Sequence, residues 1–111
     1  MATMSIHRLS ATELLAALDR GELSSVAIVR ALHQRIDGLN SRLNCFVMRR
    51  PEEAEAEARA ADAARRRGDD LGPLHGLPLT VKDNIALRGA DSTMGLEARR
   101  GRPAGDHAPV V

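Results

Sequence analysis

The feature that most constrains this chain is a lysine at the end of an alternating apolar stretch. Residues 72–85 read Gly-Pro-Leu-His-Gly-Leu-Pro-Leu-Thr-Val-Lys-Asp-Asn-Ile, with apolar residues at every second position from Leu77 to Val81. Alternation behind Gly and Pro breakers predicts a strand over 77–82 that enters a packed sheet. Lys82 closes this strand and is the only lysine among the 16 basic residues of the chain.

The choice of lysine at this position is chemically informative. Arginine stays protonated at any working pH, whereas a lysine loses its proton when burial penalises the ammonium. Lys82 is therefore a candidate acid/base group. The alternative is an ordinary charge that protects the end of a strand, and composition alone favours that interpretation.

The whole string around Lys82 resembles the lysine motif of the amidase signature family, and a looser match continues through 92–95 and 106–111. The resemblance implies hydrolysis of an amide C–N bond by a Ser-cisSer-Lys triad, in which Lys82 takes the place of the family's lysine. Both serines of that triad belong to a Gly/Ser-rich segment far downstream of the motif. We therefore expect this chain to be an N-terminal portion of the domain and to be inactive alone.

The resemblance also implies a mechanism. A neutral Lys82 takes a proton, through the bridging cis serine, from the serine that attacks the amide carbon. Backbone N–H groups hold the oxyanion, and the proton returns to the leaving amine. Asp83 and Asn84 are placed either to orient the lysine or to form a local turn. Ser92 lies in the following loop, but no Gly-rich elbow surrounds it. No residue is assigned to substrate binding.

Two helices are predicted at the start of the chain. A capping box between Ser10 and Glu13 begins the first helix. Ser24 caps a second helix, whose apolar residues follow a spacing of three to four and which we expect to end near Gly38. Together they predict a helical hairpin over 9–40.

A third helix is predicted over 51–68. Pro51 suits its first position, and Gly68 suits its end. Acidic residues crowd its front and arginines its rear, which is the favourable arrangement for the helix dipole. Its buried face consists of alanine, so it contributes little hydrophobic area and needs a partner surface.

The apolar run over 43–48 predicts a short buried strand anchored by Phe46. Cys45 in this run is interpreted as a small buried hydrophobe rather than a catalytic thiol. His33 is interpreted as a hydrogen-bonded boundary residue, because no second metal-binding side chain lies at helical spacing from it. Ser41 is expected in the connection before this strand.

Composition and charge exclude several functions. The net charge is +1 with balanced signs, so we expect neither direct nucleic-acid binding nor membrane binding. The N-terminal region lacks the apolar run of a signal peptide, and no segment approaches a membrane span, so we expect a cytoplasmic protein. No spacing of residues supports a metal site, a nucleotide site or a cofactor.

We predict an α/β fold, specifically a helix-dominated N-terminal piece of a large mixed-sheet amidase signature domain, with an irregular tail over 86–111. The expected partners are a small-molecule amide substrate in the complete enzyme, and the remainder of the domain or other subunits. One alternative within the family is part of the A subunit of a tRNA-dependent amidotransferase. The other is a non-catalytic helical interaction module, in which Lys82 is only a surface charge.

Overall fold

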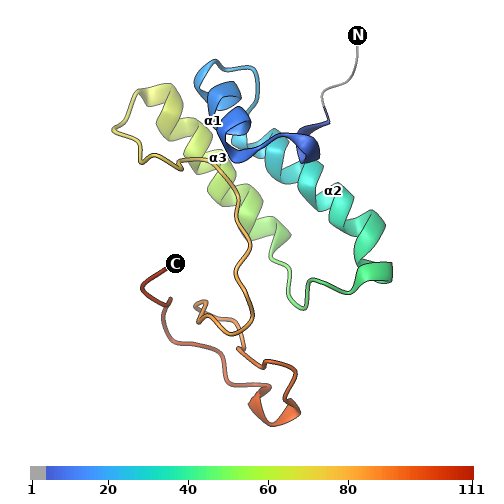
Figure 1. Cartoon of the computed structure of the whole chain (residues 1–111). Helices are drawn as coiled ribbons and strands as arrows, with labels where there is room; N and C mark the ends of the chain where they lie inside the picture. The colour runs from blue at the N-terminus through green and yellow to red at the C-terminus, as the bar shows by residue number, and fades with distance from the viewer. Residues whose placement is uncertain (1–4) are drawn as a thin grey trace. The chain divides into compact units, whose positions relative to one another are not determined.

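The structure is a computed structural model that describes residues 5–111 (Figure 1). The chain divides into two compact units, and each is described here by itself. The helical unit extends up to Pro78 and the C-terminal unit covers Leu79–Val111. The elements, in order, are η1 (Ile6–Arg8), α1 (Ala11–Asp19), α2 (Ser25–Leu43), α3 (Pro51–Arg67) and η2 (Glu97–Arg99).

Helix α1 begins at the predicted capping box. The Ser10 hydroxyl accepts the N–H of Glu13 at 3.3 Å, and the Glu13 carboxylate accepts the N–H of Ser10 at 2.7 Å. The hydrogen bond from the Ser10 backbone, followed by that from its hydroxyl, holds the pKa of Glu13 below its ordinary value. Leu9, just outside the helix, packs against a buried cluster that contains Leu14. The local sequence therefore defines this helix start without help from distant residues.

Helix α2 is longer than predicted, because it continues through Gly38 and ends at Leu43. A glycine inside a helix costs about 0.5–1 kcal/mol relative to alanine, but it keeps its N–H group and does not stop the helix. The actual end is Asn44, which adopts the left-handed conformation with φ of 49°. The side chain of Asn40 then accepts the N–H groups of Cys45 and Phe46, each at 3.0 Å.

The strand predicted over 43–48 does not form. Leu43 is the last residue of α2, the following residues are coil, and Ser41 lies inside the helix rather than in a connection. Cys45 is exposed instead of buried, and Val47 is 75% exposed. A strand needs a neighbouring strand to pair its backbone groups, and residues 5–111 supply none to this segment.

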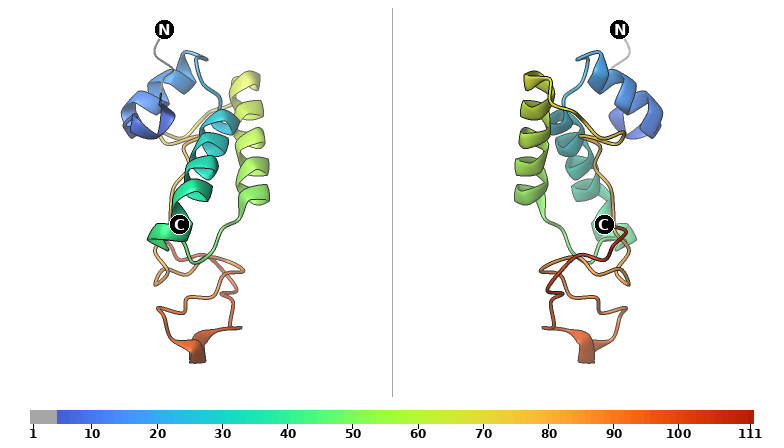
Figure 2. Two further views of the ribbon diagram at one scale, coloured as in Figure 1. Left: turned by 90° about the vertical axis from the view of Figure 1, so that its right-hand side faces the viewer. Right: turned by 90° about the vertical axis from the view of Figure 1, so that its left-hand side faces the viewer.

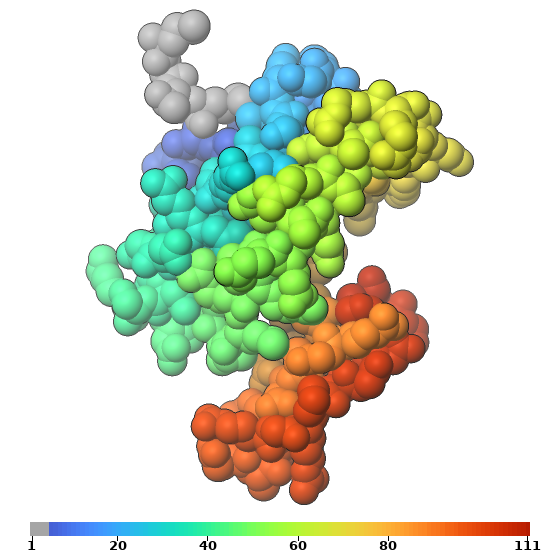
Figure 3. Space-filling model, turned by 180° about the vertical axis from the view of Figure 1, so that it is seen from behind, coloured from blue at the N-terminus to red at the C-terminus, as the bar shows by residue number. Residues whose placement is uncertain are grey.

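Helix α3 lies antiparallel alongside α2, as both side views of Figure 2 show. It begins at Pro51, ends at Arg67 and is followed by Gly68 with φ of 74°. Ala58 is buried against the neighbouring helix and Ala54 is partly buried. The small side chains allow close approach, and the two helices form one continuous surface in the space-filling view (Figure 3).

A carboxylate from α3 caps the start of α2. Asp62 accepts the N–H of Ser25 at 2.7 Å and the N–H of Val26 at 3.2 Å. The hydroxyl of Ser24 accepts the N–H of Ala27 at 3.1 Å. Three of the four N–H groups left open at a helix start are therefore satisfied, two of them by a residue far along the sequence.

The core of the helical unit lies where α1 meets the first turns of α2. Leu14, Leu18 and Ile28 are buried and form one cluster. Ile6, Leu9, Leu15, Leu23, Leu32 and Leu77 pack around it. Leu77 belongs to the lysine motif, so one residue of the motif packs against this core.

The C-terminal unit is mostly irregular. Two isolated β-bridges, Arg88 with Ala104 and Asp91 with Pro103, hold its coil together. The strand predicted over 77–82 is absent, and Leu79 in this segment is 73% exposed. The physical reason is the same as for 43–48, because the described residues offer no strand that could pair with it. The described chain is thus helix-dominated, without the sheet that the sequence predicts.

Candidate active site

The first half of the lysine motif is fixed to the helical unit. Nε2 of His75 lies 2.9 Å from the carbonyl oxygen of Ala61 on α3, so this ring nitrogen is the donor. Arg65 donates to the carbonyl oxygen of His75 at 3.1 Å and to the carboxylate of Asp19 at 2.5 Å. His75 therefore connects the motif to α3 through its ring and its backbone carbonyl group.

Gly76 lies directly against the start of α2. Its φ is +82°, and a Cβ atom at this position would lie 2.3 Å from Oγ of Ser25. Ser25 is only 1% exposed, and its hydroxyl has no hydrogen-bond partner among residues 5–111. Both the backbone conformation and the close contact require glycine.

Lys82 lies in a turn at the start of the C-terminal unit. The N–H of Ile85 donates to the carbonyl oxygen of Lys82 at 2.9 Å, which closes the turn. The lysine residue itself is exposed. Deprotonation through burial thus requires a cover that residues 5–111 do not supply.

Asp83 organises the loop that follows the lysine turn. One oxygen of its carboxylate accepts the N–H of Met94 at 2.6 Å and the hydroxyl of Thr93 at 3.3 Å. The Thr93 hydroxyl in turn accepts the N–H of Gly95 at 3.3 Å. Asp83 therefore fastens the segment 93–95, while Asn84 is exposed and its side chain has no hydrogen bond in the described chain.

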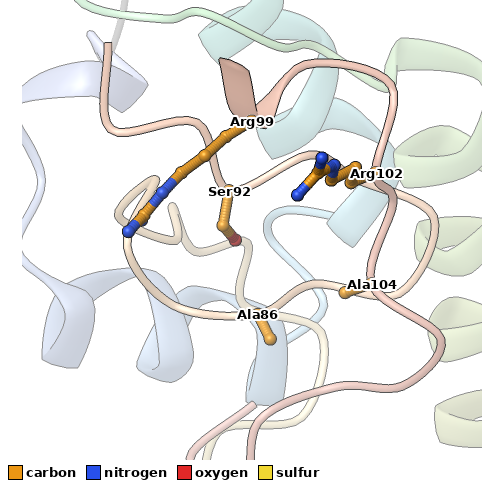
Figure 4. Close-up of a pocket in the computed structure, with 5 residues that line it drawn as sticks. All are labelled: Ala86, Ser92, Arg99, Arg102 and Ala104. Carbon is orange, nitrogen blue, oxygen red and sulfur yellow. The ribbon is translucent and has the colours of Figure 1, made fainter. Parts of the chain in front are cut away.

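Ser92 is half-buried and lines a hollow in the C-terminal unit (Figure 4). The other lining residues are Ala86, Arg99, Arg102 and Ala104. The sequence did not reveal this hollow or the bonds of Asp83 to the loop. The only available signal was the polar Ser-Thr pair ahead of Gly95, which is typical of turns.

Metal and membrane sites are not found in the described part of the chain. Residues 5–111 contain no cluster of three or more His, Cys, Asp or Glu side chains that could hold a metal ion. None of the helices in this range has the length and apolar character needed to cross a membrane.

The relatives of this chain are enzymes that are much longer than it. It is 42% identical over 90 residues to the A subunit of the glutamyl-tRNA(Gln) amidotransferase of Moorella thermoacetica, in a match that covers 81% of this chain and 18% of the relative. It is 35% identical over 111 residues to an acylamidase of Rhodococcus erythropolis, covering 100% and 23%. An indoleacetamide hydrolase of Bradyrhizobium diazoefficiens is 39% identical over 102 residues, covering 92% and 20%. The chain thus spans about a fifth of the length of these relatives.

Solved structures and a family profile agree with this relationship. A structure described as a vestigial protein complex that reveals the evolutionary origins of an s-triazine catabolic enzyme superposes with a TM-score of 0.84 at 31% identity. The match covers 90% of this chain and 22% of the solved chain. The profile of the Amidase family matches residues 27–111, which include the whole lysine motif. This chain belongs to the amidase family.

Proposed function

We propose that Lys82 is the proton acceptor for amide C–N bond hydrolysis in a longer domain, of which these 111 residues form a part. The observation that carries this proposal is the lysine itself. It is the only lysine of the chain, and it lies within the residues that the family profile matches, in the string that resembles the family's lysine motif. The Ser-cisSer-Lys triad is completed by the rest of the domain.

The structure around Lys82 supports a catalytic role for this turn, but it leaves the lysine uncovered. Asp83 fixes the loop 93–95 next to the turn, so the surroundings of Lys82 are ordered by a residue that follows it directly. Because Lys82 is exposed here, we infer that the remainder of the domain covers it and thereby favours the neutral amine. Asp83 is thus a positioning residue, and Asn84 remains a candidate for the same role.

The substrate in this proposal is a small-molecule amide, hydrolysed in the cytoplasm without a cofactor. The nucleophilic serine attacks the amide carbon, and its proton passes through the bridging serine to Lys82. The proton then returns to the leaving amine, and water releases the acyl group. The 111 residues alone carry out none of these steps, because they supply only the lysine.

A second candidate is part of the A subunit of a tRNA-dependent amidotransferase. The identity of 42% to the corresponding protein of Moorella thermoacetica favours it. In this case the chemistry at Lys82 is the same, but the protein works together with other subunits.

A chimera tests the role of Lys82. Residues 1–111 replace the matching segment of the Rhodococcus erythropolis acylamidase, which aligns with the whole chain, and turnover of an acylamide is measured. We expect activity in the chimera and a loss of roughly 10²-fold or more in kcat for Lys82→Ala, since general-base catalysis contributes about 10²–10⁴-fold. Lys82→Arg fails similarly because arginine does not give up its proton.

Arg100→Gln is the matched control, because it removes one positive charge from the same unit at an exposed residue that pairs only with Glu97. It should leave kcat unchanged. A Lys82→Ala chimera as active as the unchanged chimera contradicts the proposal and favours the helical interaction module. A chimera that unfolds like the parent enzyme and is still inactive contradicts it as well.

A further inference from the structure

The hollow in the C-terminal unit is lined by charged, polar and apolar side chains. Its volume is about 280 Å³, and two alanines, one serine and two arginines line it. Figure 4 shows the Arg99 and Arg102 side chains on either side of Ser92, with Ala86 and Ala104 below Ser92 in the view. The site therefore combines two positive charges, one hydroxyl and the methyl groups of two alanines.

The two arginines of the hollow differ from other arginines of the same unit. Arg88 pairs with Asp106 at 2.5 Å, and Arg100 pairs with Glu97 at 3.3 Å. Neither Arg99 nor Arg102 forms a side-chain ion pair within residues 5–111. No carboxylate of the described chain therefore forms an ion pair with either guanidinium group.

The acidic residues nearby in the sequence bond to other groups and not to Arg99 or Arg102. Asp91 accepts the N–H of Gly101 at 2.6 Å, and Asp83 is occupied by the loop 93–95. Asp106 accepts from Arg88, and this hydrogen bond holds its pKa below the ordinary range, so it remains charged and engaged. No carboxylate lines the hollow.

We propose that Arg99, Arg102 and Ser92 form a binding site for a small oxyanion, a carboxylate or a phosphate. A guanidinium group presents paired N–H donors that match two oxygens of such an anion, and these charge-assisted bonds are the strong ones. The Ser92 hydroxyl donates a further bond. The alanines bring no competing charge. This site is independent of the proton transfer proposed for Lys82.

An NMR titration of the 111-residue chain tests the site. Sodium phosphate and sodium acetate are added separately at constant ionic strength, and the backbone amide shifts of Ala86, Ser92 and Ala104 are followed. We expect saturable shifts at these residues with at least one of the two anions. The anion with the lower Kd identifies the source, and either anion supports the site.

Variants distinguish specific binding in the hollow from general attraction of anions to a positively charged surface. Arg99→Gln and Arg102→Gln, made singly and together, should each raise the Kd by about tenfold or more, as expected for lost hydrogen bonds between charged groups. Arg100→Gln removes the same charge and should leave the Kd unchanged. Both hollow arginines are exposed residues, and far-UV circular dichroism checks that each variant keeps its helices.

Two outcomes overturn the proposal. One is that Arg100→Gln weakens binding as much as the hollow variants, which means that only net charge attracts the anion. The other is that neither anion gives saturable shifts at Ser92, which means that the hollow does not bind oxyanions.

Discussion

The helical unit and the C-terminal unit differ in how fully they pair their backbone groups and bury their apolar side chains. In the helical unit, α1, α2 and α3 satisfy their own backbone groups and bury Leu14, Leu18 and Ile28. In the described C-terminal unit, Ala90 is the only hydrophobic residue that is buried. Met94, Leu96 and Val110 there are at least half exposed.

The contrast shows which parts of the described chain take their structure from local interactions. A helix pairs its N–H and C=O groups within one segment, whereas a strand must find partners elsewhere. The helical unit therefore stands on its own hydrogen bonds and core. The segment that carries Lys82 finds no strand to pair with among residues 5–111 and is coil.

The largest expected change in stability comes from removing core volume in the helical unit. Leu18 is 1% exposed, and Leu18→Ala should lower the free energy of unfolding by about 2–5 kcal/mol, since it leaves a cavity. Urea unfolding of the chain followed by circular dichroism at 222 nm measures this. Leu96→Ala in the C-terminal unit, at a residue that is 54% exposed, should change it by less than about 0.5 kcal/mol. Equal losses in the two variants contradict the difference between the units.

A second test asks whether the motif is fixed to the helical unit at Gly76. Gly76→Ala places a Cβ 2.3 Å from Oγ of Ser25 at a φ of +82°. Overpacking and the left-handed conformation together should cost roughly 2–4 kcal/mol of unfolding free energy. The same urea titration measures the loss.

The matched control is Gly68→Ala, at a φ of +74° with no atom within 4 Å of the added Cβ. This substitution should lower the free energy of unfolding by about 1–2 kcal/mol, because only the left-handed backbone conformation opposes it. Ser25→Ala should recover part of the loss in the Gly76→Ala background, because it removes the clashing oxygen. If Gly68→Ala is as destabilising as Gly76→Ala, the contact at Ser25 has no energetic weight.

The smallest effect concerns an ion pair on the surface of the helical unit. Arg30 donates to the Glu55 carboxylate at 2.5 Å, Arg59 donates to the same oxygen, and together they lower the pKa of Glu55 to about 2. Glu55 thus stabilises the folded state above its ordinary pKa of 4.5. This contribution should be lost as the pH falls from about 4.5 towards 2.

Glu55→Gln should reduce the pH dependence of helix unfolding in that range, and added salt should weaken the effect because the pair is at the surface. Carbon NMR of the Glu55 carboxyl gives its midpoint directly. Asp106→Asn, in the C-terminal unit, should leave the pH dependence of helix unfolding unchanged. A Glu55 midpoint near 4.5 in the folded chain contradicts the prediction.

Local signals allowed the helices to be predicted from the sequence. Ser10, Ser24 and Pro51 mark helix starts through bonds or geometry within a few residues, and each of them does so in the structure. Helix α2 ends later than the sequence predicts, because the helix continues through Gly38. The structure places the end at Asn44, whose turn depends on the side chain of Asn40.

The features that the sequence did not reveal depend on residues distant in the chain. Asp62 caps α2 from α3, and nothing in the local sequence of Asp62 indicates this. Neither predicted strand forms, because residues 5–111 offer no strand that could pair with it. Cys45 lies in one of these two segments and is exposed. For the candidate site, the motif alone identified Lys82, while the bonds of Asp83 to Met94 and the hollow beside Ser92 needed three-dimensional structure.

The boundary between the two units falls inside the lysine motif, after Pro78. His75 and Gly76 serve the helices through Ala61 and Ser25, whereas the turn at Lys82 makes its described bonds only within residues 79–111. The motif thus has two structurally separate parts, one that contacts the helices and one that forms the lysine turn. A segment that carries the lysine turn into another scaffold should therefore begin at Leu79. His75 and Gly76 can be left out, because their contacts are with the helical unit.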